Sequence, residues 1–378
     1  MMSSPSTAQV GEDRGVTSHR VASLTGIRAV AAMTVVLTHA AYTTGHYTKD
    51  YGGLLLARME IGVPIFFALS GYLLFAPWAK NAASGVAAPS VRRYAWRRVR
   101  RIMPAYVITV LIAFALYHFR LGGPNPGHTW VGFIRNLTLT QIYADKYAYS
   151  YLHQGLQQMW SLAVEVSFYV ALPLLAYLLL VVLCRRRWQP KRLVAGLIGM
   201  MLVSPAWLVL VHTTDWLPDG AHLWLPAYLA WFAGGMLLAA LQQIGVRVYA
   251  LVCVPLAVIC FLIAATPIAG APQTLPLELR EALVKVIFYM VIAALAIAPL
   301  ALGNRGWYAR LLATRPMVFL GEISYEIFLI HVIIMELVMV EVLQWQIYHG
   351  SFVWLFVVTM VFTVPVAWVL HRFTRVPT

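Results

Sequence analysis

Residues 24–46 of the chain read LTGIRAVAAMTVVLTHAAYTTGH, an apolar run in which Arg28 is the only lysine, arginine, aspartate or glutamate. A helix of about 20 residues crosses the roughly 30 Å hydrocarbon core of a bilayer, whereas a strand of a membrane barrel needs only about 10 residues. A helix also satisfies its backbone hydrogen bonds within one segment, as a membrane requires. The run therefore predicts a transmembrane helix.

Nine further runs of similar length follow, and the chain of 378 residues is 61% hydrophobic but only 11% charged. So few polar residues cannot cover a water-soluble globule of this size. We predict an all-α membrane protein, a single bundle of about ten transmembrane helices with a central cavity. The predicted helices lie near residues 24–46, 58–79, 102–120, 160–184, 193–212, 223–243, 249–268, 280–303, 317–341 and 351–371.

This transmembrane domain is expected to occupy residues 21–371, between a polar cytoplasmic tail at 1–20 and a short cytoplasmic tail at 372–378. No small-residue cleavage site follows the first apolar run, so we expect that run to stay in the membrane. The long outer connection at 121–159 is too polar to span and is expected to cap an outward-facing cavity. With no second domain appended, the unit is expected to act alone.

The distribution of charge predicts the orientation. The chain has 28 lysines and arginines against 14 acidic residues, and with the N-terminus inside, 20 of the 28 fall in cytoplasmic segments and 7 in outer segments. Cytoplasmic loops are enriched in lysine and arginine, so we predict that both termini face the cytoplasm, in a multi-pass protein of the cytoplasmic membrane. This asymmetry explains the net positive charge, and we expect no nucleic-acid partner. The three cysteines lack metal-site spacing, and no metal is expected.

Two ionisable residues, Arg28 and His39, share the first predicted helix. Eleven residues at about 100° each make almost three turns, so both project from one face, about 16 Å apart along the axis. Intramembrane ionisable residues are candidates for function, and histidine is suited to general-base catalysis because its ordinary pKa is about 6.5. The alternative is structural: Arg28 reaches the inner headgroups and His39 bonds a backbone carbonyl.

Two further helices supply polar groups at depths suited to a shared cavity. Glu165 follows Trp160 and Ser161 in the fourth predicted helix, and we expect its carboxylate to lie level with His39 and to assist it. The ninth contains Ser324, Tyr325 and His331 within GEISYEIFLIH, an unusual density of polar groups. Polar packing between helices is the alternative explanation. The predicted cavity lining comprises Ser70, Trp160, Ser161, Ser324, Tyr325 and His331.

The loop expected before the third helix reads VRRYAWRRVRRIMPAY, residues 91–106. Arginine forks bind phosphate groups and aromatic rings stack on purines, so the segment is a candidate site for a nucleotide-like donor such as coenzyme A. The alternatives are a positive anchor at the inner surface or a patch for anionic lipids. The predicted donor-binding residues are Arg93, Arg97, Arg98, Arg100 and Arg101.

Five separated stretches together resemble the acyltransferase 3 family of integral membrane acyltransferases. They occur in the family's order, between residues 24 and 331, with Phe328 standing where many relatives have tyrosine. The stretches are LTGIRAVAAMTVVLTHA (24–40), GVPIFFALSGYLL (62–74), RRVRRIMPAY (97–106), WSLAVEVSFY (160–169) and ISYEIFLIH (323–331).

The resemblance implies a ten-helix fold, a cytoplasmic acyl-coenzyme A donor and His39 as the essential catalytic residue. We expect an acyl group, taken to be acetyl, to pass to a hydroxyl of an extracytoplasmic glycolipid or cell-envelope carbohydrate, with His39 as general base or acyl relay. Arg28 and Glu165 complete the expected catalytic set, and Ser70 is a candidate oxyanion donor. Acyl-coenzyme A is expected as a substrate, with no permanently bound cofactor. The rival function is transport or flipping of a lipid or glycan.

Overall fold

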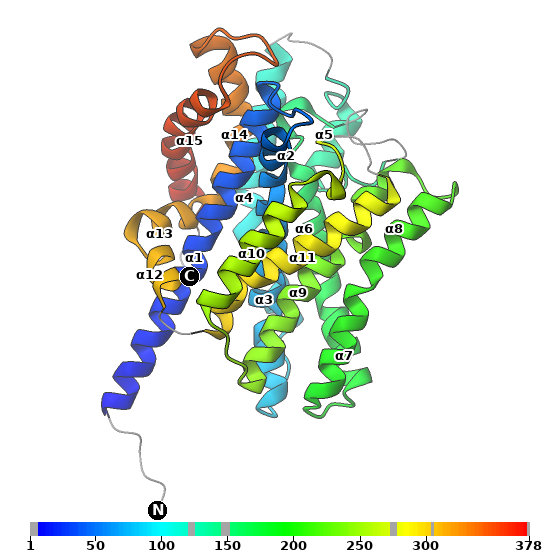
Figure 1. Cartoon of the computed structure of the whole chain (residues 1–378), viewed down its shortest axis with the longest axis vertical. Helices are drawn as coiled ribbons and strands as arrows, with labels where there is room; N and C mark the ends of the chain where they lie inside the picture. Colours follow the sequence, from blue (N-terminus) through cyan, green and yellow to red (C-terminus); the bar gives the residue numbers. More distant parts are fainter. Residues whose placement is uncertain (1–6, 120–124, 145–151, 273–277, 304–305, 376–378) are drawn as a thin grey trace, which may run out of the picture.

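A computed structural model describes residues 7–119, 125–144, 152–272, 278–303 and 306–375. Helices dominate these residues, and no strand occurs among them. The helices form one bundle, in which α1 runs beside α14 and its N-terminal end extends beyond the other helices (Figure 1). The α-helices are α1 (Thr7–Thr43), α2 (Tyr51–Ala57), α3 (Gly62–Ala83), α4 (Val91–Phe119), α5 (Trp130–Leu137), α6 (Met159–Tyr177), α7 (Pro190–Met201), α8 (Val203–Thr213), α9 (Leu225–Ile244), α10 (Ala250–Ala264), α11 (Leu279–Leu302), α12 (Trp307–Leu312), α13 (Arg315–Glu322), α14 (Ser324–Leu337) and α15 (Phe352–Thr374).

The all-helical prediction is confirmed, while the prediction of ten spans remains a prediction. Among the described residues, eight helical segments are long and apolar enough to cross a membrane. A ninth span results if α13 and the helix Ser324–Val342, bent by 70° relative to one another, are taken together. The seventh predicted span corresponds to α10, an apolar helix of 15 residues. Apolar side chains on α10 and α15, including Leu251 and Val361, are exposed, as lipid-facing residues are.

The long helix predicted at 317–341 is divided in two at Ile323. The Ser324 hydroxyl donates to the carbonyl oxygen of Gly321 at 2.8 Å, which turns the chain where α13 ends. Gly321 also lies against α1 so closely that a Cβ atom there would be 2.0 Å from the Thr25 carbonyl oxygen. Contact with α1 therefore fixes the position of the bend, and with it the direction of α14.

Small residues bring the central helices together. A Cβ atom on Gly71 of α3 would lie 2.0 Å from the Phe232 carbonyl oxygen of α9, and one on Gly235 of α9 would lie 1.8 Å from the Ala68 carbonyl oxygen of α3. Membrane helices approach this closely where glycine leaves the backbone bare. α3 lines both cavities described below, and α9 lines the larger of them.

The arginine-rich segment is helical, which corrects the prediction of a loop. α4 begins at Val91, so the arginines occupy its first three turns and continue directly into the apolar part of the helix. Arginine favours helices, and neither glycine nor proline interrupts residues 91–103. The arginines are therefore distributed around the helix and point in several directions. Similarly, α1 begins at Thr7, so the described part of the predicted N-terminal tail is helical.

Candidate active site in two adjoining cavities

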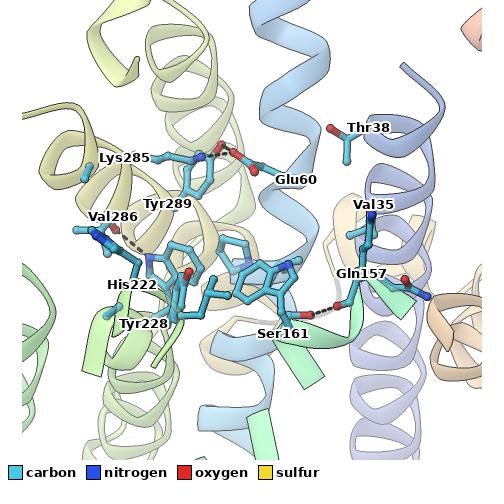
Figure 2. Close-up of a pocket in the computed structure, with 18 of the residues that line it drawn as sticks. Val35, Thr38, Glu60, Gln157, Ser161, His222, Tyr228, Lys285, Val286 and Tyr289 are labelled. Carbon is cyan, nitrogen blue, oxygen red and sulfur yellow. Dashed lines mark hydrogen bonds and ion pairs between the residues drawn. The ribbon is translucent and has the colours of Figure 1, made fainter. Parts of the chain in front are cut away.

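The larger cavity, about 300 Å³, contains His39 and is called the histidine cavity here. Aromatic rings form much of its wall: the ring of Tyr228 lies 5.2 Å from Trp160 and 5.0 Å from Trp231 between centroids. Figure 2 shows Thr38 of α1 across the cavity from Lys285 of α11. The wall thus combines broad apolar surfaces with a few polar groups, a combination suited to sugar rings.

A second histidine, His331 of α14, determines which ring nitrogen of the neutral His39 carries the hydrogen. The His331 Nδ1 atom lies 2.8 Å from the Phe328 carbonyl oxygen and 3.1 Å from that of Ile327. Carbonyl oxygens only accept, so Nδ1 carries the hydrogen of the neutral His331 ring and its Nε2 is an acceptor. The His39 Nδ1 atom lies 2.9 Å from that Nε2 and must be the donor.

The proton-free nitrogen of His39 is therefore Nε2, by elimination between the two ring atoms. In the neutral pair this atom has a lone pair able to accept a proton. His39 lines the histidine cavity, whereas His331 is fully buried and lines neither cavity. The predicted placement of His331 in the lining therefore differs from the structure, in which His331 lies behind His39 and accepts its Nδ1–H hydrogen bond.

The smaller cavity, about 180 Å³, is called the arginine cavity. Arg28, Arg98 and Arg101 line it together with Ser70 and Glu165. The Nε atom of Arg98 is buried and has no hydrogen-bond partner among the described residues. A cavity with three arginines and one carboxylate attracts anions, and an unpaired guanidinium nitrogen is a donor for one.

Glu165 is not the partner of His39, contrary to our prediction. Its carboxylate accepts hydrogen bonds from the Ser70 hydroxyl and, at 2.6 Å, from the Tyr169 hydroxyl. Glu165 lines the arginine cavity but not the histidine cavity. α6 begins at Met159, so six residues of helix place Glu165 about 9 Å further along the axis than its start. Its hydrogen-bond partners are therefore Ser70 and Tyr169 rather than His39.

The predicted arginine cluster of α4 is divided by its relation to the cavity. Arg98, which is half-buried, and Arg101, which is exposed, line the arginine cavity, while the exposed Arg93, Arg97 and Arg100 line neither cavity. Arg100 lies over the ring of Trp96 at 5.8 Å from its centroid.

The other predicted lining residues occupy one or both cavities. Trp160 lines the histidine cavity, Ser324 and Tyr325 line the arginine cavity, and Ser161 lines both. The Tyr325 hydroxyl donates to the Ile102 carbonyl oxygen at 3.0 Å, which ties α14 to α4.

The histidine cavity also contains a charged pair that we did not predict from the sequence. Lys285 Nζ lies 2.6 Å from Glu60 Oε1, which also accepts a hydrogen bond from the Tyr289 hydroxyl at 2.8 Å (Figure 2). Opposite charges at the outer ends of two predicted spans were the available signal. No group of three or more possible metal-ligating residues occurs in the described part of the chain.

The connection between α4 and α6, which we predicted to cap an outward-facing cavity, contributes Leu152, Gln157 and Gln158 to the histidine cavity. His153 anchors this segment: it is fully buried, and burial together with the nearby His128 lowers its pKa to about 3. Its ring lies 4.4 Å from that of Phe114 in α4. Residues 120–124 and 145–151 of the connection are outside the described part.

The known proteins to which this chain is similar include acyltransferases and O-acetyltransferases. Peptidoglycan O-acetyltransferase OatA of Listeria monocytogenes is 29% identical over 51% of this chain, and acyltransferase MdmB of Streptomyces mycarofaciens is 29% identical over 84%. O-acetyltransferase OatA of Staphylococcus aureus is 22% identical over 94%. The chain covers 29%, 79% and 56% of these relatives, respectively. No solved structure matches it significantly.

The model of the acyltransferase domain matches residues 21–372, which is nearly all of the helical bundle and both of its cavities. The predicted resemblance is thereby confirmed, and the chain belongs to the acyltransferase 3 family.

Proposed function

We propose that this protein is a membrane O-acetyltransferase that receives acetyl-coenzyme A in the arginine cavity and an acceptor hydroxyl in the histidine cavity. The observation that carries the proposal is the junction of the two cavities beside the His39–His331 pair: Val63, Ser161 and Phe328 line both. A donor entering from one side and an acceptor entering from the other would meet there. Because the arginine cavity adjoins the arginine-rich end of α4, its side is the one we assign to the cytoplasm.

The arginines suit an anionic donor. Coenzyme A contains a diphosphate and a further phosphate, and guanidinium groups bind such oxygens through paired hydrogen bonds. The arginine cavity, at about 180 Å³, would hold the thioester end, with phosphate contacts at its rim from Arg98 and Arg101. The exposed Arg97 and Arg100 lie outside the cavity and contribute only general attraction.

The His39 Nε2 atom is the proposed base. It takes the proton of the acceptor hydroxyl, the hydroxyl oxygen bonds to the thioester carbonyl carbon, and the carbon–sulfur bond breaks. The proton then passes from His39 to the departing thiolate, which leaves as coenzyme A thiol. Nδ1–H donates to His331 throughout, so the imidazolium formed in the reaction stays hydrogen-bonded. An acyl-histidine relay would use the same nitrogen as nucleophile.

The acceptor that fits the histidine cavity is a glycan. Trp160, Tyr228 and Trp231 offer faces on which sugar rings stack, while Glu60 and Lys285 can bind hydroxyl groups. The amide oxygen of Gln158 has no hydrogen-bond donor among the described residues, so it can accept from a hydroxyl. Two relatives named as O-acetyltransferases, one of them of peptidoglycan, support a cell-envelope glycan as the acceptor class.

Release of coenzyme A thiol tests the proposal against the rival function of transport. Purified protein in lipid nanodiscs receives acetyl-coenzyme A with and without a soluble peptidoglycan fragment. We expect acceptor-dependent thiol release and an acetylated fragment from the wild type, and neither from His39→Ala. A transporter would move substrate across a vesicle membrane without releasing thiol, and that result would reject the proposal.

A further inference from the structure

Three side chains from three different helices separate the two cavities. Val63 of α3, Ser161 of α6 and Phe328 of α14 appear in the lining of both, and no other described residue does. Ser161 and Phe328 are buried, at 4% and 8% exposed, and Val63 is half-buried. We call these three residues the partition.

Phe328 is the largest member of the partition and lies next to the histidine pair. Its ring centroid is 6.1 Å from that of His331, and its carbonyl oxygen accepts the His331 Nδ1–H bond at 2.8 Å. The main chain of Phe328 thus orients the pair, while its side chain stands between the cavities. Substituting the side chain leaves the carbonyl in place, so the two contributions can be separated by experiment.

From this geometry we infer that the Phe328 side chain limits the length of the acyl group that the enzyme transfers. The inference rests on the function proposed above. A thioester in the arginine cavity can present its carbonyl carbon to His39 only at the partition, so the remaining acyl carbons must be accommodated beside Val63, Ser161 and Phe328. A rigid ring there leaves room for a short acyl group and excludes longer ones.

The chemistry of the partition favours a purely steric boundary. Phenylalanine has no hydroxyl that needs a partner, unlike the tyrosine expected at this position from the family resemblance. The Ser161 hydroxyl donates to the Gln158 carbonyl oxygen at 3.2 Å. The partition therefore presents an apolar surface to the acyl group, and one methylene in such a setting changes specificity by roughly 10- to 200-fold.

A competition between donors tests the inference. Acetyl-coenzyme A and butyryl-coenzyme A compete in nanodisc reactions with a peptidoglycan fragment, and mass spectrometry gives the ratio of butyrylated to acetylated product. Because both products come from the same active molecules, the ratio is independent of the folded fraction. Phe328→Ala should raise the ratio at least about tenfold, Phe328→Leu should raise it less, and Phe328→Trp should lower it.

Phe356→Ala is the matched control, because Phe356 is partly buried in α15 and lines neither cavity. Its ratio should equal that of the wild type. A ratio within about twofold of the wild type in all three Phe328 variants would overturn the inference while leaving the proposed function intact. A wild type that consumes no acyl-coenzyme A would overturn both.

Discussion

At the scale of single residues, the account depends on one nitrogen atom. His39 can act as a base through Nε2 only while its Nδ1 carries the ring hydrogen, and the Nε2 atom of His331 accepts a hydrogen bond from that Nδ1 at 2.9 Å. The two histidines are 292 positions apart in the chain. Both histidines lie in predicted helices that carry several polar residues, but the sequence contains no signal for their pairing. Which faces of two helices meet depends on how the helices rotate about their own axes when they pack.

His331 is a positioning residue whose substitution should affect turnover more than binding. His331→Ala removes the acceptor, and we expect kcat to fall by about 100-fold or more, with KM values changed less than about threefold. His331→Gln offers an amide oxygen near the position of Nε2, so its kcat should be at least about tenfold higher than that of His331→Ala. Steady-state acetyl transfer measures both, and equal kcat values in the two variants would contradict the assignment.

At the scale of the element, α4 shows why a cluster in sequence is not a cluster in space. Successive residues of a helix point about 100° apart, so Arg98 lies on the face of the buried Ile102 and Ala105, and Arg100 points away from that face. Arg101 lies at the edge of the face and lines the cavity, whereas Arg97, one turn before Arg101, does not. The position of each arginine around the helix could have been read from the sequence, since the apolar stripe of the same helix marks its inner face. It was obscured because the segment was taken to be a loop.

Arginines of α4 inside and outside the cavity should therefore differ in their effect on the donor. Combined Arg98→Ala and Arg101→Ala should raise the KM for acetyl-coenzyme A by at least about tenfold, since each removes a hydrogen bond to a charged group. Combined Arg97→Ala and Arg100→Ala removes the same charge from exposed side chains that do not line the cavity, and should change KM less than about threefold. Similar increases in both double variants would show that α4 attracts the donor only through its total charge.

The contact between α3 and α9 predicts a stability effect at Gly235. A methyl group there would collide with the Ala68 carbonyl oxygen, so Gly235→Ala must separate the helices and should cost about 1–3 kcal/mol. Gly199→Ala, which adds the same atoms where nothing lies within 4 Å, is the control. Thermal unfolding in detergent measures both, and equal melting temperatures would contradict the described helix contact.

At the scale of the whole molecule, composition and the length of the apolar runs predicted an all-helical membrane bundle. This was possible because only helices and closed barrels can span a bilayer with all backbone hydrogen bonds satisfied. The division into two cavities could not be predicted. It depends on where Val63, Ser161 and Phe328 meet, and these residues belong to helices distant in sequence. The level of Glu165 relative to His39 also depends on where helices begin, which hydropathy locates only to within a few residues.

The central claim is that an acetyl group passes from one side of the membrane to the other through the two cavities. The most direct measurement uses proteoliposomes in which the protein has a single orientation. Acetyl-coenzyme A labelled in the acetyl group is added on the side of the arginine cavity, and a peptidoglycan fragment is enclosed on the other side.

Label recovered on the enclosed fragment after removal of external donor reports transfer across the membrane. The account predicts labelled fragment with the wild type, none with His39→Ala, and coenzyme A thiol only on the donor side. Labelling that requires donor and fragment on the same side, or that persists in His39→Ala, would contradict it.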